Sequence, residues 1–164
     1  MPQIYISTGR KPSQLTRKFG RLLSLILNAK YENRGKKSVD EICARAEKFG
    51  CIRIAFIYEK KGNPALIQFY DEGKGWMDGE LMVLGVNLPE RSGRIPKNLK
   101  IIAEDAEGGK IAALFGIEME VEDETSKLGG KFSESRIDFL VAGKIVLEMK
   151  CKLIENREKR PGDE

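Results

Sequence analysis

The chain has 164 residues, of which 41% are hydrophobic and 33% are charged, so its size and composition fit one globular domain with its own core. It contains no histidine, which excludes Ser-His and Cys-His nucleophile pairs and most zinc sites. Its apolar runs are shorter than the ~18 residues that cross a bilayer, and the first residues lack the pattern of a signal peptide. We therefore expect a cytoplasmic protein that makes no membrane contact.

Positive charge is concentrated near the N-terminus. The net charge of the chain is +4, yet residues 1–40 hold nine Lys and Arg against two acids, a net charge of +7. The remaining residues must therefore sum to −3. Such an uneven distribution is typical of proteins that bind a polyanion, and nucleic acid is the leading class of partner.

The first segment predicts a short strand over 4–6, a turn over 7–9 and a helix that begins around Ser13. Free backbone N–H groups, the positive end of the helix dipole and the cations Arg10 and Lys11 would all lie at the N-terminal end of this helix, which we call its mouth. Such an arrangement suits an anion. A tight turn with an N-cap and a solvated basic face explains the same residues. The segment alone leaves both interpretations open.

The helix that follows is predicted to be amphipathic. Five apolar residues recur at helical spacing and form one stripe, namely Leu15, Phe19, Leu22, Leu23 and Ile26. The opposite side carries Gln14, Arg17, Lys18 and Arg21. Like charges one turn apart cost an isolated helix a few tenths of a kcal/mol per pair, and an anionic partner would relieve that repulsion. We therefore favour a nucleic-acid surface over a merely solvated face.

The rest of the pattern predicts a mixed α/β sheet with helices packed on it. Helices are expected over 38–49, where Ser38 and Glu41 form a capping box, and over 107–115. Strands are expected over 51–59, 65–70, 80–86, 100–104, 117–121, 136–142 and 145–154, and loops over 73–79, 88–97 and 124–131. Both halves then run strand, helix, strand and hairpin, with residues 155–164 as a disordered charged tail.

Chemical motifs are absent from the sequence. Cys43, Cys51 and Cys151 lack the spacing of a metal site and are predicted to be reduced thiols among apolar residues. The lysine- and glycine-rich segment at Gly35 fails the pattern of a phosphate-binding loop, because Lys30 stands where its first glycine belongs. We expect no enzyme activity, no metal and no cofactor.

The opening segment resembles the signature of the Brix-domain family of ribosome-biogenesis proteins. The matching residues are Ile6, Ser7, Thr8, Arg10, Pro12, Ser13, Thr16 and Phe19, while Gly9 stands where a serine is usual. The resemblance implies a single-domain archaeal form over 1–154, with related halves of about 1–90 and 91–154. Each half would be similar to the anticodon-binding domain of class II aminoacyl-tRNA synthetases. It also implies a role in ribosomal RNA processing and subunit assembly without catalysis.

We therefore predict a monomeric ribosome-biogenesis factor that binds ribosomal RNA, with ribosomal or other assembly proteins as further partners. The predicted RNA-binding residues are Ser7, Thr8, Arg10, Lys11, Ser13, Arg17, Lys18, Arg21, Lys36 and Lys37. Aromatic side chains that could stack on bases are scarce near this surface, because Phe19 and Phe49 are predicted as core and Tyr5 as part of a strand. Recognition of RNA shape and backbone is therefore favoured over single-strand readout.

Two alternatives remain open at this point. The first is a small α/β enzyme that binds a phosphorylated ligand at residues 7–11, with Asp78 or Asp105 as a base. The second is a protein-interaction module whose acidic second half binds a basic ribosomal partner.

Overall fold

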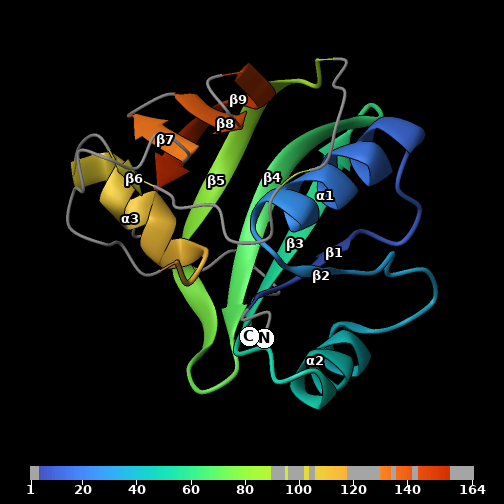
Figure 1. The fold of residues 1–164 in the computed structure, drawn as a ribbon. Coiled ribbons are helices and arrows are strands. Elements are labelled where there is room, and N and C mark those ends of the chain that lie inside the picture. The colour runs from blue at the N-terminus through green and yellow to red at the C-terminus, as the bar shows by residue number, and fades with distance from the viewer. Residues whose placement is uncertain are drawn as a thin grey trace.

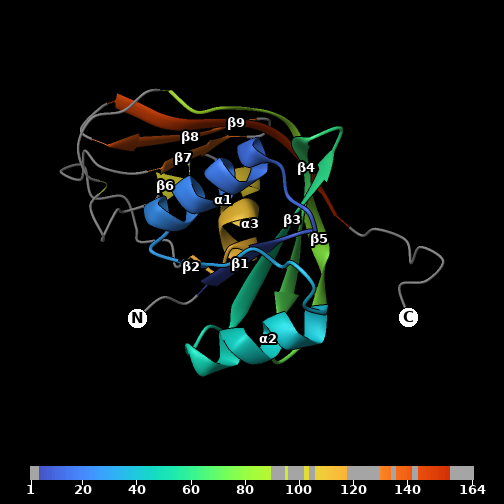
Figure 2. The ribbon, with the colours of Figure 1, turned by 90° about the vertical axis from the view of Figure 1, so that its right-hand side faces the viewer.

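A computed structural model describes residues 4–89, 95, 102–103, 106–117, 130–133, 136–141 and 144–155. The helices are α1 (Gln14–Ile26), α2 (Val39–Lys48) and α3 (Ala106–Leu114). The strands are β1 (Ile4–Thr8), β2 (Lys30–Tyr31), β3 (Arg53–Lys60), β4 (Asn63–Asp71), β5 (Gly75–Asn87), β6 (Ile102–Ala103), β7 (Gly130–Ser133), β8 (Arg136–Val141) and β9 (Lys144–Ile154). The strands form one curled mixed sheet, with α1 and α3 on its inner side and α2 on its outer side (Figure 1, Figure 2). The predicted mixed α/β architecture is confirmed.

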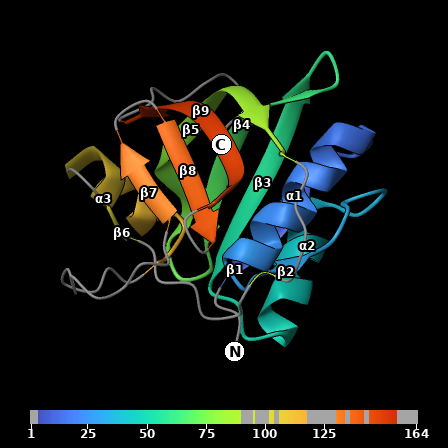
Figure 3. The same cartoon turned by 45° about the horizontal axis from the view of Figure 1, so that its top comes forward.

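The strand order, β2-β1-β3-β4-β5-β9-β8-β7-β6, is almost symmetric about its centre. On one side β1 runs parallel to β3, and β4 and β5 follow antiparallel. On the other side β6 runs parallel to β7, and β8 and β9 follow antiparallel. The antiparallel pair β5–β9 joins the two sides. Helix α1 lies over β1 and β4, and α3 lies beside β6 and β7 (Figure 3).

The core has two parts because successive side chains of a strand point to opposite faces. Ile4 and Ile6 of β1 face the inner side, where they join a large cluster with Phe19 of α1 and residues of β3, β4, β5, α3, β8 and β9. Tyr5 faces the outer side and packs in a smaller cluster with Ile42 of α2. The predicted apolar stripe of α1 is confirmed, since four of its five residues are buried and Leu15 is half-buried.

The predicted helix starts are confirmed by their caps. The Ser13 Oγ accepts a hydrogen bond from the Thr16 N–H at 3.2 Å, and the Ser38 Oγ accepts one from the Glu41 N–H at 3.1 Å. Helix α2 ends before Gly50, whose φ of +73° is the left-handed conformation that glycine adopts without strain.

One arginine ties the two sides of the sheet together. The Arg53 guanidinium of β3 donates to the carbonyls of Ala113 and Leu114 at 2.7 and 2.5 Å, at the C-terminal end of α3. It also pairs with Asp71, directly opposite on β4, at 3.0 Å. A cation at this position satisfies exposed carbonyls and complements the negative end of the helix dipole.

Two expectations about the sequence pattern are wrong. The predicted loop over 73–79 is mostly strand, because β5 begins at Gly75 and the hairpin continues through the pair Tyr70↔Trp76. The Trp76 ring packs 5.4 Å from the Tyr70 ring, which favours the extended pairing. Phe49, predicted as core, is 41% exposed, because it caps the end of α2 beyond the last buried turn.

In the second half of the chain, one strand begins within a segment that is predicted to be a loop. The predicted loop over 124–131 overlaps β7, which begins at Gly130 and pairs with β6 and β8. Most of the predicted strand over 117–121 lies outside the described residues, as do most of the break over 88–97 and the charged tail beyond Glu155.

Candidate nucleic-acid interface

Three parallel strands end at one edge of the sheet, and a basic loop follows each of them. Strands β2 and β3 both run parallel to β1, so the loops over 9–13, 32–38 and 61–62 lie near one another (Figure 1). We call this the basic edge, defined by Arg10, Lys11, Arg34, Lys36, Lys60 and Lys61. Sequence reasoning missed Arg34, Lys60 and Lys61, because only the parallel register brings the β3–β4 turn next to the first loop.

Hydrogen bonds fix the first two loops to each other. The Ser7 Oγ donates to the Glu32 carbonyl at 2.8 Å, and the Arg34 N–H donates to the Thr8 Oγ1 at 3.3 Å. The Arg34 Nε donates to the Lys37 carbonyl at 3.0 Å. The side chains of Ser7 and Thr8 are buried, so these two predicted site residues hold the loops in place and do not present hydroxyls to solvent.

The mouth of α1 already contains an anion, which is the chain's own Glu59. Its Oε2 accepts hydrogen bonds from the Ser13 N–H at 3.0 Å and the Thr16 Oγ1 at 2.6 Å. Burial acts to raise the pKa of Glu59, but the hydrogen bonds from Thr16 and Ser13 outweigh it and hold this pKa below its usual range. The Ser13 N–H at this mouth is therefore engaged by an internal carboxylate, because β3 brings Glu59 to it.

The second acidic group of the region is also engaged. The Arg45 guanidinium of α2 donates to both oxygens of Glu32, at 2.6 Å for the closest pair, and Lys37 Nζ lies 3.8 Å away. Burial acts to raise the pKa of Glu32, whereas the bonds and charge of Arg45 and the charge of Lys37 lower it below its usual range. Lys37 is therefore partly neutralised, while Lys36 beside it is exposed.

The outward face of α1 continues the positive surface away from the basic edge. Lys18 and Arg21 are exposed, and within the described residues neither forms an ion pair with a carboxylate. Arg17 is half-buried, and its Nε is the buried side-chain polar atom of the described chain that has no hydrogen-bond partner. Burial raises the pKa of the Tyr31 hydroxyl, and the nearby charges of Arg21 and Arg17 offset part of that rise.

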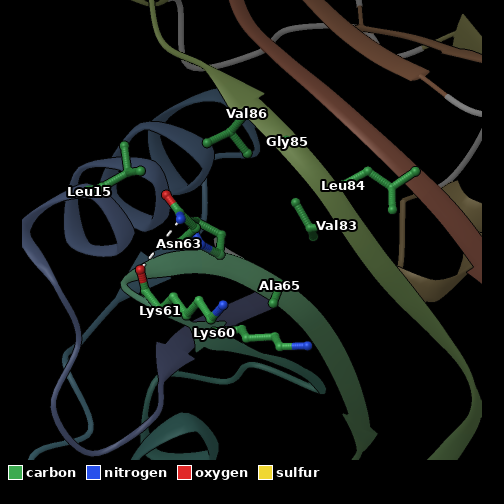
Figure 4. Close-up of a pocket in the computed structure, with 10 residues that line it drawn as sticks. Leu15, Lys60, Lys61, Asn63, Ala65, Val83, Leu84, Gly85 and Val86 are labelled. Atoms are coloured by element: carbon green, nitrogen blue, oxygen red, sulfur yellow. Dashed lines mark hydrogen bonds between the residues drawn. The ribbon is translucent and has the colours of Figure 1, made fainter.

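A groove lies beside the basic edge, where β4 and β5 separate (Figure 4). The β4–β5 ladder ends at the pair Leu66↔Met82, and β5 then shifts its register against β9 after Val83. The resulting hollow has a volume of about 420 Å³. Its apolar lining comes from Leu15, Pro64, Ala65, Val83, Leu84, Gly85 and Val86, and its polar lining from Lys60, Lys61 and Asn63. None of these lining residues is acidic.

The catalytic alternative gains no support from the geometry. Asp78 is exposed on β5, and two strands separate β5 from β1, so this carboxylate does not face the loop over 7–11. Asp105 lies outside the described residues. In the described part of the chain, no cluster of three or more Cys, Asp or Glu side chains could hold a metal ion. None of the three described helices combines the length and apolar character needed to cross a membrane.

Comparison with known proteins supports the resemblance seen in the first segment. No family model matches the chain. It is 37% identical over 82 residues to a probable Brix domain-containing ribosomal biogenesis protein of Archaeoglobus fulgidus, which covers 50% of each chain. It is 43% identical over 70 residues to the protein of the same description from Methanothermobacter thermautotrophicus, which covers 43% of each chain. The chain is a homologue of archaeal Brix-domain proteins. The aligned part spans about half the length of these curated relatives or less.

Solved structures extend the similarity to nearly the whole chain. Mil, an archaeal Imp4-like protein, superposes with a TM-score of 0.76 at 25% identity and covers 93% of this chain and 99% of its own. A probable ribosomal biogenesis protein from Aeropyrum pernix superposes with a TM-score of 0.71 at 22% identity, covering 96% and 98%, and this likeness concerns the fold alone. The sequence relatives from Archaeoglobus fulgidus and Methanothermobacter thermautotrophicus are the homologues that are named as ribosomal biogenesis proteins.

Proposed function

We propose that the protein is a cytoplasmic, non-enzymatic ribosome-biogenesis factor that binds structured ribosomal RNA. The observation that carries the proposal is a set of exposed cations on the basic edge and along α1. Arg10, Lys11, Lys18 and Arg21 form no ion pair within the described residues, while the nearby carboxylates of Glu59 and Glu32 are engaged in internal hydrogen bonds. The names of the homologues support a role in ribosome assembly.

The RNA-binding surface would consist mainly of charged side chains that meet phosphates. Arg10, Lys11, Lys18, Arg21 and Lys36 are exposed and would supply these contacts. In this proposal Ser7, Thr8 and Ser13 position the loops. Arg17 adds positive charge from a half-buried position, and the charge of Lys37 is partly neutralised by Glu32. Helix α1 and the three basic loops together form a surface that suits recognition of the shape and backbone of a folded RNA.

The proposal includes a two-part organisation of residues 1–154. The near-symmetric strand order about β5–β9 supports two related halves, of about 1–90 and 91–154. The likeness of each half to an anticodon-binding domain rests on the Brix-like first segment and is part of the proposal. Ribosomal and other assembly proteins are proposed as further partners, with the protein acting as a monomer.

The salt dependence of binding to a structured ribosomal RNA transcript tests the electrostatic basis of the proposal. If about four to six phosphates are engaged, the logarithm of affinity should fall against the logarithm of salt concentration with a slope of roughly −3 to −5. Lys18→Glu with Arg21→Glu should lower affinity by more than about tenfold, because phosphates then meet anions. The matched control, Lys48→Glu with Lys74→Glu, makes the same charge change at exposed positions away from the basic edge. Equal affinities for the two folded double variants would contradict the proposal.

A further inference from the structure

The groove between α1, the β3–β4 turn and β5 has the features of a site for a single RNA base. We propose that it receives one unstacked nucleotide of the bound RNA, with the base on its apolar lining and the adjoining phosphate on Lys60 and Lys61. This inference rests on the proposed function, because it places a specific contact within an RNA-binding surface.

The size and lining of the groove suit a nucleobase. Ligand sites typically enclose about 300–1,000 Å³ and combine an apolar lining with a few polar groups, and this hollow of about 420 Å³ falls in that range. Leu15, Ala65 and Val86 offer aliphatic surface to a base (Figure 4). The amide of Asn63 lines the same hollow and has both donor and acceptor atoms for the edge of a base.

The groove lies where the phosphate backbone of an RNA bound at the basic edge would pass. The Ser13 Oγ donates to the Gly62 carbonyl at 2.7 Å, which holds the β3–β4 turn against the start of α1. The same contact brings Lys60 and Lys61 next to the loop that carries Arg10 and Lys11. An RNA strand that follows the basic edge would therefore pass the mouth of the groove with its phosphates already neutralised.

The charge and the backbone both favour RNA over a peptide strand as the occupant. The lining contains two lysines and no carboxylate, which suits a phosphate group. Pro64 lies in the segment of β4 that extends beyond its ladder with β5, and proline has no N–H to offer to an added strand. A peptide would therefore lose a main-chain hydrogen bond there, whereas a base needs only the apolar surface and the polar rim.

The inference is tested with two short RNA duplexes that differ only in one unpaired, bulged nucleotide. The wild-type protein should bind the bulged duplex about tenfold more tightly, because a bulged base costs little to unstack. Ala65→Leu fills the groove from a half-buried position and should remove most of this preference, while binding of the paired duplex stays unchanged. Ala44→Leu, at an exposed position on α2, adds the same side chain elsewhere and should keep the preference.

A second variant keeps the test valid if Ala65→Leu fails to fold. Lys60→Gln with Lys61→Gln changes exposed side chains and should weaken binding of the bulged duplex more than binding of the paired one. Lys48→Gln with Lys74→Gln is its control for the loss of two charges. Equal wild-type affinity for the two duplexes, or a preference that survives filling of the groove, would overturn the inference and leave the proposed function intact. Failure of the protein to bind either duplex would remove both.

Discussion

The carboxylate at the mouth of α1 leads to a quantitative prediction. Glu59→Gln keeps the size of the side chain but removes the charge that receives the Ser13 N–H at 3.0 Å and the Thr16 hydroxyl at 2.6 Å. Since the first turn of α1 contains no acidic residue, Glu59 is also the negative charge that complements the positive end of this helix. The variant should therefore destabilise the protein through local hydrogen bonding, without creating a cavity.

The size of the effect follows from the two contacts. A hydrogen bond to a charged group contributes about 1.5–3 kcal/mol and a neutral one about 0.5–1.5 kcal/mol, so each bond weakens by about 1 kcal/mol. The amide oxygen of glutamine retains part of both contacts, and Glu59 is only half-buried, so the free energy of unfolding should fall by about 1–3 kcal/mol. For a chain of this size the melting temperature should fall by roughly 3–10 °C.

The pH dependence separates this mechanism from a general loss of packing. The folded state holds the pKa of Glu59 below its ordinary value of 4.5. The stabilisation is therefore complete above that value and is lost as the pH falls through the folded-state pKa. Melting temperatures of wild type and Glu59→Gln, measured by circular dichroism, should differ most near neutral pH and converge in acid.

A matched substitution controls for the change of net charge. Glu47→Gln alters an exposed carboxylate of α2 and should shift the melting temperature by no more than about 1–2 °C. The reasoning is refuted if Glu59→Gln melts like wild type at neutral pH, or if its deficit stays constant as the pH is lowered.

Three further predictions concern local packing and burial. Gly20→Ala should destabilise the fold by about 1–2 kcal/mol in urea unfolding despite the better helix propensity of alanine, because its Cβ would lie 2.4 Å from Tyr31 Cε2; a stability gain would show that the Tyr31 ring moves freely. Gly9→Ser should change stability by less than about 0.5 kcal/mol, since a Cβ there would lie an ordinary 3.6 Å from Tyr58 Cδ1; a large loss in the same assay would contradict this. Iodoacetamide at pH 8 should leave Cys151 unmodified in the folded protein, because burial raises the pKa of its thiol to about 11, and peptide mass spectrometry with a urea-unfolded control reads this out.

Local features of the fold could be read from the residues that form them. The start of α1 at Ser13 and of α2 at Ser38 depends on hydrogen bonds within three residues, and the apolar stripe of α1 repeats at helical spacing. The predicted strands over 51–59 and 65–70 are confirmed as β3 and β4 for the same reason, because the Gly62 turn separates two adjacent apolar runs that then pair as a hairpin. Prediction failed where the sequence pattern is weak. The first residues of β5 contain glycines and are predicted as loop, yet they pair with β4 through aromatic contacts.

The amino-acid sequence by itself determined the positive N-terminal region, the two capped helices and the likeness to Brix-domain proteins. Only the tertiary structure decided what stands at the mouth of α1, where Glu59, more than forty positions away in sequence, accepts the hydrogen bonds. It also decided that Lys60 and Lys61 join the basic edge and border a groove. The physical reason is that caps and periodicity act over a few residues, whereas the position of a charge in space depends on the register of strands distant in sequence.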